Sequence, residues 1–389
     1  MIRVTIVVPW FGDYCRGGAE TLTRDIYGIL ENLECDVEIA TTTVRDFSAD
    51  WSQRYYPEGI TSESGYKVRR FDPTPRDSEH FDAINARLLH GNVVTEQEDL
   101  EFIHNNIRSL KLNQYISSGT RDVYMYIPYV YGTTLFGLMS NREKNILVPL
   151  LHDESYAHLR FVQRSLRLAD NVVFVSEAER DVWTRLLGEA PRRQWVIPVP
   201  VSPVERDTGC TVNPHFQRYV LYAGRKDTNK NVQFVFDVLR HVRTDIGCVL
   251  IGGGKLEIPT DIAGRVYDAG YVSEQAKSYL MKNAICLMQP SRYESFGIVA
   301  AEASMEGTPV IVNSRCEVLR QYVDASGGGI HTESVETAAR QVEEWSNNEV
   351  SRQEAGERGA SYAVTHFALG PVTQQYRSML QALSQEAAI

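Results

Sequence analysis

Short apolar runs alternate with amphipathic stretches along this chain, and that alternation constrains the fold more than any other feature. At the amino terminus the pattern predicts a strand at residues 4–8, a loop at 9–18, a helix at 19–33 and a strand at 37–40. Strands that alternate with helices form parallel sheets with helices on both faces. Further strands of this set are expected at residues 123–127, 145–151 and 171–175, and Ser176-Glu-Ala-Glu179 predicts a capping box that opens a helix.

A proline-rich segment separates this first set from a second one. Val196-Ile-Pro-Val-Pro-Val-Ser-Pro203 holds three prolines in six residues, which excludes a helix and favours an extended connection. Beyond it the pattern predicts strands at 219–223, 248–251, 265–268, 285–288 and 310–312, and helices at 231–242, 273–282, 298–305, 335–346, 351–365 and 371–383. Pro371 fits the first position of the last helix. We expect two doubly wound domains, with ligands bound beyond the carboxyl ends of the strands in a cleft between them.

Length and composition agree with a two-domain globular protein. The 389 residues exceed one ordinary core, and 43% are hydrophobic while 23% are charged. The formal net charge of -10 argues against nucleic acid as a partner, because nucleic-acid binding relies on basic surface. The six cysteines lack the close spacing of a zinc or redox site; they are Cys15, Cys35, Cys210, Cys248, Cys286 and Cys316. Several of them fall in apolar runs and are expected to be small buried hydrophobes.

Residues 46–118 break the alternation. They are polar and aromatic, and a helix is predicted at 96–112. An elaboration that helps to shape an acceptor site and plain helical packing are equal alternatives for this segment.

Two glutamates with seven residues between them form the most informative motif, Glu294-Ser-Phe-Gly-Ile-Val-Ala-Ala-Glu302. Because residues 298–305 are predicted to be helical, Glu294 lies in the preceding loop and Glu302 in the second turn. A helix start carries a partial positive charge that suits anionic or hydroxyl-rich ligands. Its backbone N–H donors are those of Ser295, Phe296, Gly297 and Ile298. Two solvated surface glutamates are the plain alternative, but Phe296 and Gly297 suit an ordinary exposed helix start poorly.

A second loop supplies cations, in the sequence Gly224-Arg225-Lys-Asp-Thr-Asn-Lys230. Arg225 and Lys230 follow a predicted strand and precede a predicted helix. An arginine fork and a lysine ammonium together would offset the negative charge that builds on a departing diphosphate. Taken alone, a basic surface turn explains the loop equally well.

Two loops of the first domain also end predicted strands. Gly17 and Gly18 open the first helix, where missing side chains let the backbone approach a phosphate or sugar. The glycine pair is weak evidence by itself, because the dinucleotide pattern G-x-G-x-x-G is absent. His152-Asp153 follows the strand at 145–151. A lone histidine is more often structural than catalytic, but its place at the carboxyl end of a parallel strand makes His152 a candidate for catalysis.

Taken together and in this order, these motifs resemble glycosyltransferase family 4, enzymes of GT-B fold. The resemblance rests on Gly17-Gly18-Ala-Glu20, His152-Asp153, Ala169-Asp-Asn-Val-Val-Phe-Val-Ser176, Gly224-Arg225 with Lys230, and Glu294-x7-Glu302. It covers nearly the whole chain, with residues 46–118 the least similar stretch. It implies an α/β fold of two Rossmann-like domains facing a central cleft: residues 1–200 on the acceptor side, with the helix at 371–389 packed against them, and residues 204–370 binding the nucleotide sugar.

The resemblance also implies an activity. A hexose of mannose or glucose type would pass, with retention of configuration and without a metal, from a GDP- or UDP-linked sugar to a glycan or lipid-linked acceptor in cell-surface polysaccharide or O-antigen synthesis. Arg225 and Lys230 would hold the diphosphate, and Glu302 the ribose hydroxyls. Glu294 would face the donor sugar, backed by the N–H groups of Phe296 and Gly297. His152 would lie near the transferred sugar, and Gly17 and Gly18 on the phosphate side.

The charge pattern favours the same metal-free chemistry. No Asp-x-Asp pair follows a predicted strand, and two cations can replace a divalent ion on the leaving group. No other cofactor is expected. Two departures from the family weaken individual assignments: Ile197-Pro-Val-Pro-Val-Ser202 replaces the usual Ile-Pro-Asn-Gly-Val-Asp, and Lys226 competes with Lys230 as the phosphate cation.

Other activities remain open at the level of sequence. A GT-B nucleotide-sugar epimerase, a Rossmann-type oxidoreductase that uses Gly252-Gly-Gly254, and a non-catalytic glycan-binding subunit are the alternatives, in that order. The chain enters a strand pattern at once, without the apolar stretch of a signal peptide or a membrane span. We therefore expect a cytoplasmic protein that meets the inner face of the membrane when its acceptor is lipid-linked.

Overall fold

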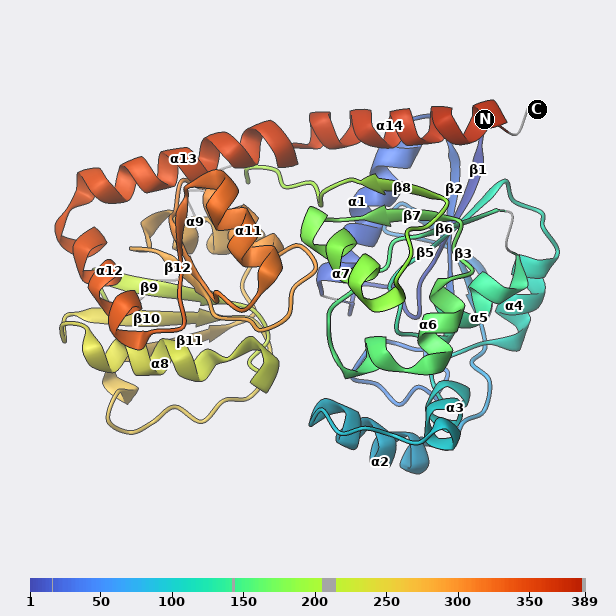
Figure 1. The fold of residues 1–389 in the computed structure, drawn as a ribbon, viewed down its shortest axis with the longest axis horizontal. Coiled ribbons are helices and arrows are strands. Elements are labelled where there is room, and N and C mark those ends of the chain that lie inside the picture. The colour runs from blue at the N-terminus through green and yellow to red at the C-terminus, as the bar shows by residue number, and fades with distance from the viewer. Residues whose placement is uncertain (16, 142–143, 205–214, 387–389) are drawn as a thin grey trace. The chain divides into compact units, whose positions relative to one another are not determined.

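The computed structural model describes residues 1–15, 17–141, 144–204 and 215–386, and the chain divides into two compact units (Figure 1). One unit comprises Met1–Ile197 and Thr373–Ile389, and the other comprises Pro198–Val372. Each unit is an α/β structure built on one sheet, as the alternating pattern predicts.

The sheet of the first unit has the strand order β3-β4-β2-β1-β5-β6-β7-β8. Every neighbouring pair is parallel except the antiparallel pair β3 and β4. The strands are β1 Arg3–Val7, β2 Asp36–Thr42, β3 Gly59–Glu63, β4 Tyr66–Phe71, β5 Val123–Tyr126, β6 Asn145–Leu147, β7 Asn171–Phe174 and β8 Arg193–Val196. The strand β6 ends at Leu147 rather than at the predicted residue 151. His152 therefore lies within the loop that follows β6 and not directly at the strand end.

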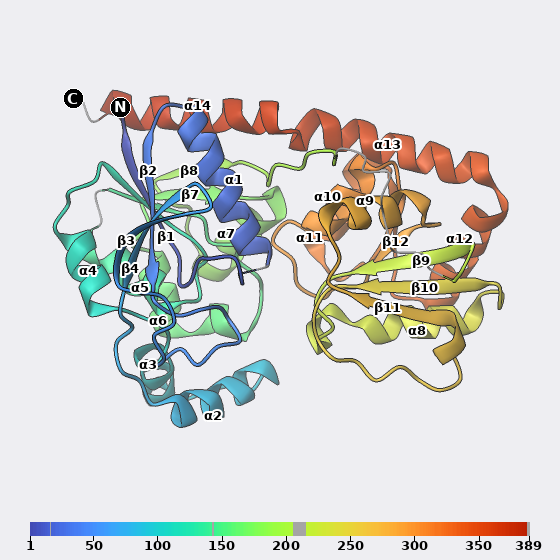
Figure 2. The same cartoon turned by 180° about the vertical axis from the view of Figure 1, so that it is seen from behind.

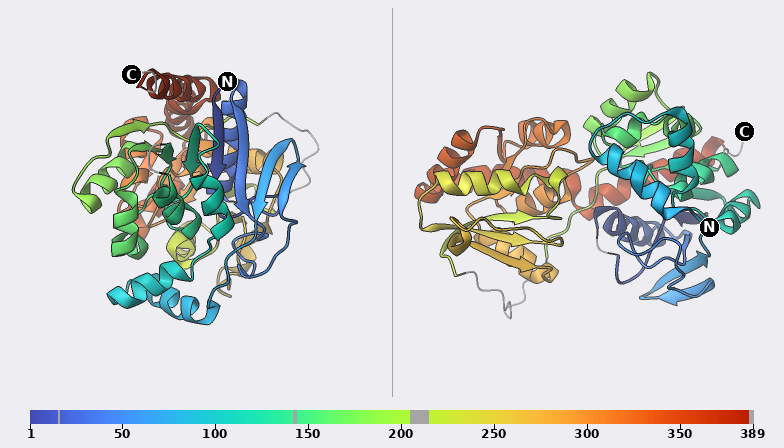
Figure 3. Two further views of the ribbon diagram at one scale, coloured as in Figure 1. Left: turned by 90° about the vertical axis from the view of Figure 1, so that its right-hand side faces the viewer. Right: turned by 90° about the horizontal axis from the view of Figure 1, so that it is seen from below.

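The segment 46–118 contains more regular structure than its sequence predicts. A hairpin of β3 and β4 extends the sheet at one edge, where both strands are seen in Figure 3. The single helix predicted at 96–112 is wrong, because two helices form there, each opened by its own cap at Thr95 and Ser109. The helices of this segment are α2 Ser78–Leu89, α3 Glu96–His104 and α4 Leu110–Ser117.

The remaining helices of the first unit are α1 Gly18–Asn32, α5 Gly132–Ser140, α6 Arg160–Leu166 and α7 Glu177–Leu187, with a short 3-10 turn η1 at Ser155–His158. The last helix, α14 at Leu369–Glu386, lies beside α1 in both Figure 1 and Figure 2. Tyr376 of α14 is fully buried, and the Asp25 charge on α1 contributes to a rise in its pKa that burial dominates. Pro371 is the third residue of α14 rather than the first, still within the turn whose N–H groups need no helical partner.

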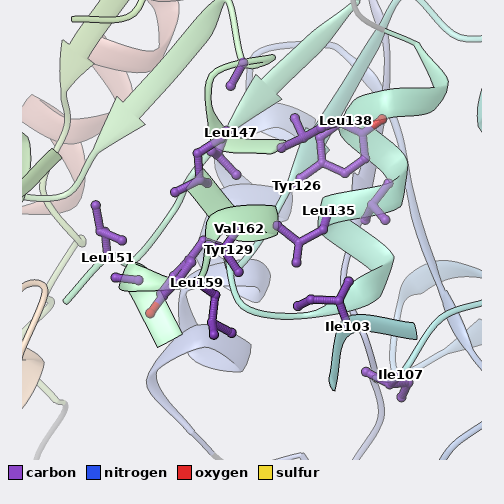
Figure 4. Packing of buried hydrophobic residues seen from close by; sticks show 14 of the residues in the cluster. Ile103, Ile107, Tyr126, Tyr129, Leu135, Leu138, Leu147, Leu151, Leu159 and Val162 are labelled. Atoms are coloured by element: carbon purple, nitrogen blue, oxygen red, sulfur yellow. The ribbon is translucent and has the colours of Figure 1, made fainter. Parts of the chain in front are cut away.

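The core of the first unit joins the sheet to the helices that cover it. Figure 4 shows Tyr126 and Leu147 of the sheet packed with Leu135, Leu138 and Val162 of α5 and α6. Leu151 belongs to the same cluster and is 1% exposed. The backbone just before His152 is therefore anchored by apolar burial.

The second unit has an all-parallel sheet of order β11-β10-β9-β12-β13-β14. Its strands are β9 Arg218–Ala223, β10 Ile246–Ile251, β11 Val266–Gly270, β12 Leu287–Gln289, β13 Val310–Val312 and β14 Gly329–His331. Its helices are α8 Val232–His241, α9 Glu274–Asn283, α10 Ile298–Met305, α11 Glu317–Ser326, α12 Val335–Asn347 and α13 Glu349–Phe367, with 3-10 turns η2 Thr228–Lys230 and η3 Ala263–Arg265. The predicted helix 298–305 and strand 310–312 are confirmed residue for residue.

The proline-rich connection is extended after β8, as predicted, and it is held to the second unit at Val201, whose N–H donates to Phe367 O at 2.8 Å. Five cysteines are free and buried, which confirms their expected role as small hydrophobes. Cys210 lies outside the described residues.

Candidate functional site

The turn between Glu294 and α10 depends on a glycine that no other residue can replace without a shift. Gly297 caps α10 with φ of +83°, a left-handed conformation that side chains disfavour. A Cβ at this position would lie 2.5 Å from Leu319 Cδ2. Phe296 is buried, and its ring packs edge-on against Phe367 with centroids 4.9 Å apart. The Ser-Phe-Gly turn is therefore fixed by packing, and it sets the start of α10 rigidly beside Glu294.

Glu294 is held by two side chains that come from different strand ends. Lys230 Nζ donates to Glu294 Oε1 at 2.6 Å, and Gln289 Nε2 donates to the same oxygen at 2.9 Å. The Lys230 and Glu294 side chains are 23% and 14% exposed, so the ion pair is only partly accessible to water. The structure thus brings a cation and a carboxylate into direct contact at the start of α10.

Backbone bonds fix the loop that carries Lys230. Asp227 caps η2 by accepting the Lys230 N–H at 3.1 Å. Arg292 N–H donates to Asn229 O at 3.0 Å, which ties this loop to the one before Glu294. The contact between Lys230 and Glu294 is therefore built into the backbone of two adjacent loops.

Three basic residues follow β9, and the structure gives them different surroundings. Lys226 is buried, with a side chain 1% exposed, and its Nζ donates to Gly252 O at 2.7 Å and to Asp268 Oδ1 at 2.8 Å. It joins the ends of β9, β10 and β11. Arg225 is 63% exposed, with a guanidinium nitrogen 3.4 Å from Asp227 Oδ2. The Lys226 ammonium is therefore bonded within the protein, whereas Arg225 and Lys230 remain the candidate residues for binding an anion.

Glu302 forms a second ion pair on α10. Lys277 of α9 donates to its Oε1 at 2.7 Å, and both side chains are 20% exposed. Burial raises the pKa of the Glu302 carboxyl, and the Lys277 charge opposes that rise. Burial also disfavours the Lys277 ammonium, but the nearby Glu302 and Glu274 carboxylates leave its pKa raised. Each of the two side chains therefore favours the charged form of the other, in a site that is only partly accessible to water.

The sequence reasoning missed Lys277 and Gln289. Gln289 had a usable signal, because it is the polar residue that ends the buried strand β12 in a parallel sheet. Lys277 had none beyond its place on a helix, since only the packing of α9 against α10 brings it to Glu302.

The first unit holds the glycine pair and the histidine. Gly17 is the N-cap of α1, and a Cβ there would lie 2.4 Å from Glu20 Oε2. Glu20 accepts a hydrogen bond from Trp10 Nε1 at 2.6 Å, so its carboxylate folds back over the helix start. Gly18 is the first residue of α1 and is exposed.

His152 lies among carboxylates. Its Nδ1 is 3.2 Å from Glu154 Oε1, an oxygen that also accepts from Tyr129 Oη at 3.0 Å. An acceptor at this distance favours the tautomer that carries hydrogen on Nδ1. The predicted capping box forms in part: Ser176 Oγ accepts the Glu179 N–H at 3.1 Å, while the Glu179 carboxylate accepts from Leu151 and Val175.

Two findings bear on other kinds of site. Within the described residues, no group of three or more His, Cys, Asp or Glu side chains gathers as a metal site. Across the same part of the chain, no helix has the length and apolar character needed to cross a membrane.

A hollow lined by Arg218, Arg243 and Arg265 lies at the amino ends of β9 and β10, away from the loops that carry Lys230.

Sequence comparison matches residues 211–362 to the family described as glycosyl transferases group 1. The alpha-1,3/1,6-mannosyltransferase of Dictyostelium discoideum is 25% identical over 112 residues, which are 29% of this chain and 27% of that protein. The chain spans about a quarter, 27%, of the length of the curated relatives it matches.

Solved structures show the fold over the full length. Sucrose-phosphate synthase from Thermosynechococcus elongatus has a TM-score of 0.74 at 15% identity, covering 99% of this chain and 100% of that chain. The Anabaena protein HepE, solved in complex with UDP and glucose, has a TM-score of 0.68 at 14% identity, covering 98% and 100%. Residues 211–362 therefore match the glycosyl transferases group 1 family, and the chain as a whole has the GT-B fold.

Proposed function

We propose that this protein is a retaining, metal-independent glycosyltransferase. It moves a hexose of mannose or glucose type from a nucleotide-diphosphate sugar to a glycan or lipid-linked acceptor, in the synthesis of cell-surface polysaccharide such as O-antigen. The observation that carries the proposal is the contact of Lys230 with Glu294 at the rigid start of α10. A cation and a carboxylate at one point suit a ligand that has a diphosphate and a sugar bonded to each other.

The leaving group requires positive charge. In the transfer, the bond from the anomeric carbon to the diphosphate breaks and a bond to an acceptor oxygen forms, so negative charge grows on the diphosphate. Arg225 and Lys230 offset that charge, and the fixed N–H dipoles at the start of α10 add to it. Lys230 is only partly exposed beside Glu294, so part of its hydration is already lost before the anion arrives.

The two glutamates have separate duties. Glu294 orients the donor sugar, and its direction is set by Gln289 and Lys230. Glu302 accepts hydrogen bonds from the ribose hydroxyls, and Lys277 keeps it ionised against its burial. His152 acts on the transferred sugar, and Gly17 and Gly18 line the phosphate side.

Support for the donor class comes from the similar proteins. HepE was solved with UDP and glucose, and a curated relative is a mannosyltransferase. We therefore propose a GDP- or UDP-linked hexose as donor, used in the cytoplasm and, for a lipid-linked acceptor, at the inner face of the membrane.

A thermal-shift panel of GDP, UDP, ADP and dTDP sugars tests the donor assignment. A ligand at 100 times its dissociation constant stabilises the folded protein by about 2.7 kcal/mol, so one nucleotide should raise the melting temperature clearly. The same panel with Lys282→Ala, an exposed cation on α9 outside the site, should give the same shift. No shift with any sugar nucleotide contradicts the proposal. Product formed from the donor without acceptor would identify an epimerase instead.

A further inference from the structure

Glu179 is a fully buried carboxylate with an unusual set of partners. Its side chain is 0% exposed, Oε1 accepts the Leu151 N–H at 2.6 Å, and Oε2 accepts the Val175 N–H at 2.6 Å. The Leu150 N–H also favours the ionised carboxylate. Glu179 lies in the first turn of α7, yet it binds the backbone of a loop 28 residues earlier in the chain. Capping of α7 falls to Ser176, so the carboxylate is available for another role.

The loop that Glu179 holds is strained. Leu150 has φ of +52°, a left-handed conformation that is rare for a leucine. This conformation turns the N–H groups of Leu150 and Leu151 in one direction, so that successive backbone donors form a small anion-binding concavity. The Glu179 carboxylate occupies that concavity and stabilises a backbone that leucine does not adopt easily.

His152 follows Leu150 and Leu151 directly. The Nδ1 of its ring lies within hydrogen-bond distance of Glu154 Oε1, which also accepts from Tyr129. Glu154 therefore orients the imidazole, and Glu179 fixes the backbone from which the imidazole projects. The Glu154 and Glu179 carboxylates therefore both orient His152, Glu154 through the ring and Glu179 through the backbone.

We propose that Glu179 is the positioning residue for His152: it clamps Leu150 and Leu151 and so sets the direction in which the His152 side chain projects from the loop after β6. What His152 does once positioned rests on the proposed function. The clamp itself is a property of the first unit and is measurable without any substrate.

Amide hydrogen exchange and histidine NMR test the clamp directly. Glu179→Gln keeps the volume of the side chain, but in either orientation its amide nitrogen meets an N–H and one hydrogen bond is lost. Exchange at the Leu150 and Leu151 amides should accelerate up to about 10-fold, the equilibrium equivalent of one hydrogen bond. The His152 Cε1–H signal, identified by its absence in His152→Gln, should shift and broaden.

The matched control is Glu38→Gln. Glu38 is also 0% exposed in the first unit, where it accepts from Thr5 and Arg69, but it contacts no residue of the His152 loop among the hydrogen bonds of the described chain. It should lower stability and leave the His152 signal in place. Should Glu179→Gln fail to fold, Glu179→Asp, which keeps the carboxylate but shortens its reach, should show the same two changes. An unmoved His152 signal in a folded Glu179 variant, or an equal change in Glu38→Gln, overturns the clamp.

A double-mutant cycle separates positioning from simple structural support. If Glu179 acts through His152, the transfer rate of Glu179→Gln/His152→Gln should lie within about threefold of His152→Gln alone. Effects that multiply would show that Glu179 acts independently of His152, contrary to the inference. A wild-type protein without transferase activity would refute the proposed function, while the exchange and NMR results would still decide the clamp.

Discussion

Replacing Lys230 with alanine tests the contact on which the proposed function rests. The substitution removes the ammonium 2.6 Å from Glu294 Oε1 and keeps the hydrogen bond from Gln289 Nε2 to that oxygen. Because the two side chains are 23% and 14% exposed, we expect the fold to lose about 2 kcal/mol, between the loss for an exposed ion pair and that for a fully buried one.

The effect on transfer should exceed the effect on folding. Loss of one preorganised charge stabiliser lowers a rate constant by about 100- to 1,000-fold. Loss of one charged hydrogen bond to the diphosphate should weaken nucleotide affinity by about 10- to 100-fold, corresponding to 1.5–3 kcal/mol. Lys230→Arg keeps the charge and should recover part of both losses.

The assay is the release of nucleoside diphosphate from the donor, measured with isothermal titration of the same nucleotide. Lys282→Ala, on the exposed face of α9, is the control for a change of net charge. Lys230→Ala with turnover and affinity within threefold of the wild type would refute the role assigned to the ion pair.

Four further predictions follow from the same contacts. Arg225→Ala should slow transfer by at least ~100-fold with little change in melting temperature, because its side chain is 63% exposed; near wild-type turnover would remove it from the site. Lys277→Ala should weaken nucleotide binding while Lys282→Ala does not, in titrations at pH 7; equal affinities would disconnect Lys277 from Glu302. Burial raises the pKa of Glu302, so nucleotide affinity should fall as the pH drops through a range above the ordinary glutamate value of 4.5; affinity that does not change there would contradict it. Burial raises the pKa of Glu179 to about 8, so its contribution to folding stability should decline as the pH rises from about 4.5 to 8, and Glu179→Gln should flatten urea-unfolding stability across that window; an unchanged slope would contradict the burial.

Local patterns were sufficient to predict the elements that carry the candidate site. The helix at 298–305 begins after a glycine and carries an alanine-rich face, and its bounds are those of α10. Strand and helix alternation predicted the parallel strands of both sheets, because a buried parallel strand is apolar on both faces. The hairpin β3–β4 escaped prediction, since its burial pattern shows mostly exposed and half-buried residues in β3.

Contacts between distant residues could not be read from the chain. Lys226 and Lys230 look alike in sequence, and only the packing of β9, β10 and β11 shows that Lys226 is bonded to Gly252 and Asp268. The reach of Glu179 to Leu151 likewise depends on the adjacency of β6 and β7. Local sequence identified which residue types were present, and tertiary structure decided which of them meet.

The most direct test of the account compares Glu294→Gln with Glu302→Gln, by nucleotide titration and by donor turnover in the same preparations. Glu302→Gln should weaken nucleoside diphosphate binding by about 10-fold or more, the cost of a charged hydrogen bond. Glu294→Gln should bind the nucleotide within threefold of the wild type and turn over at least ~100-fold more slowly. Identical defects in the two variants, or no defect in either, would contradict the division of duties on α10.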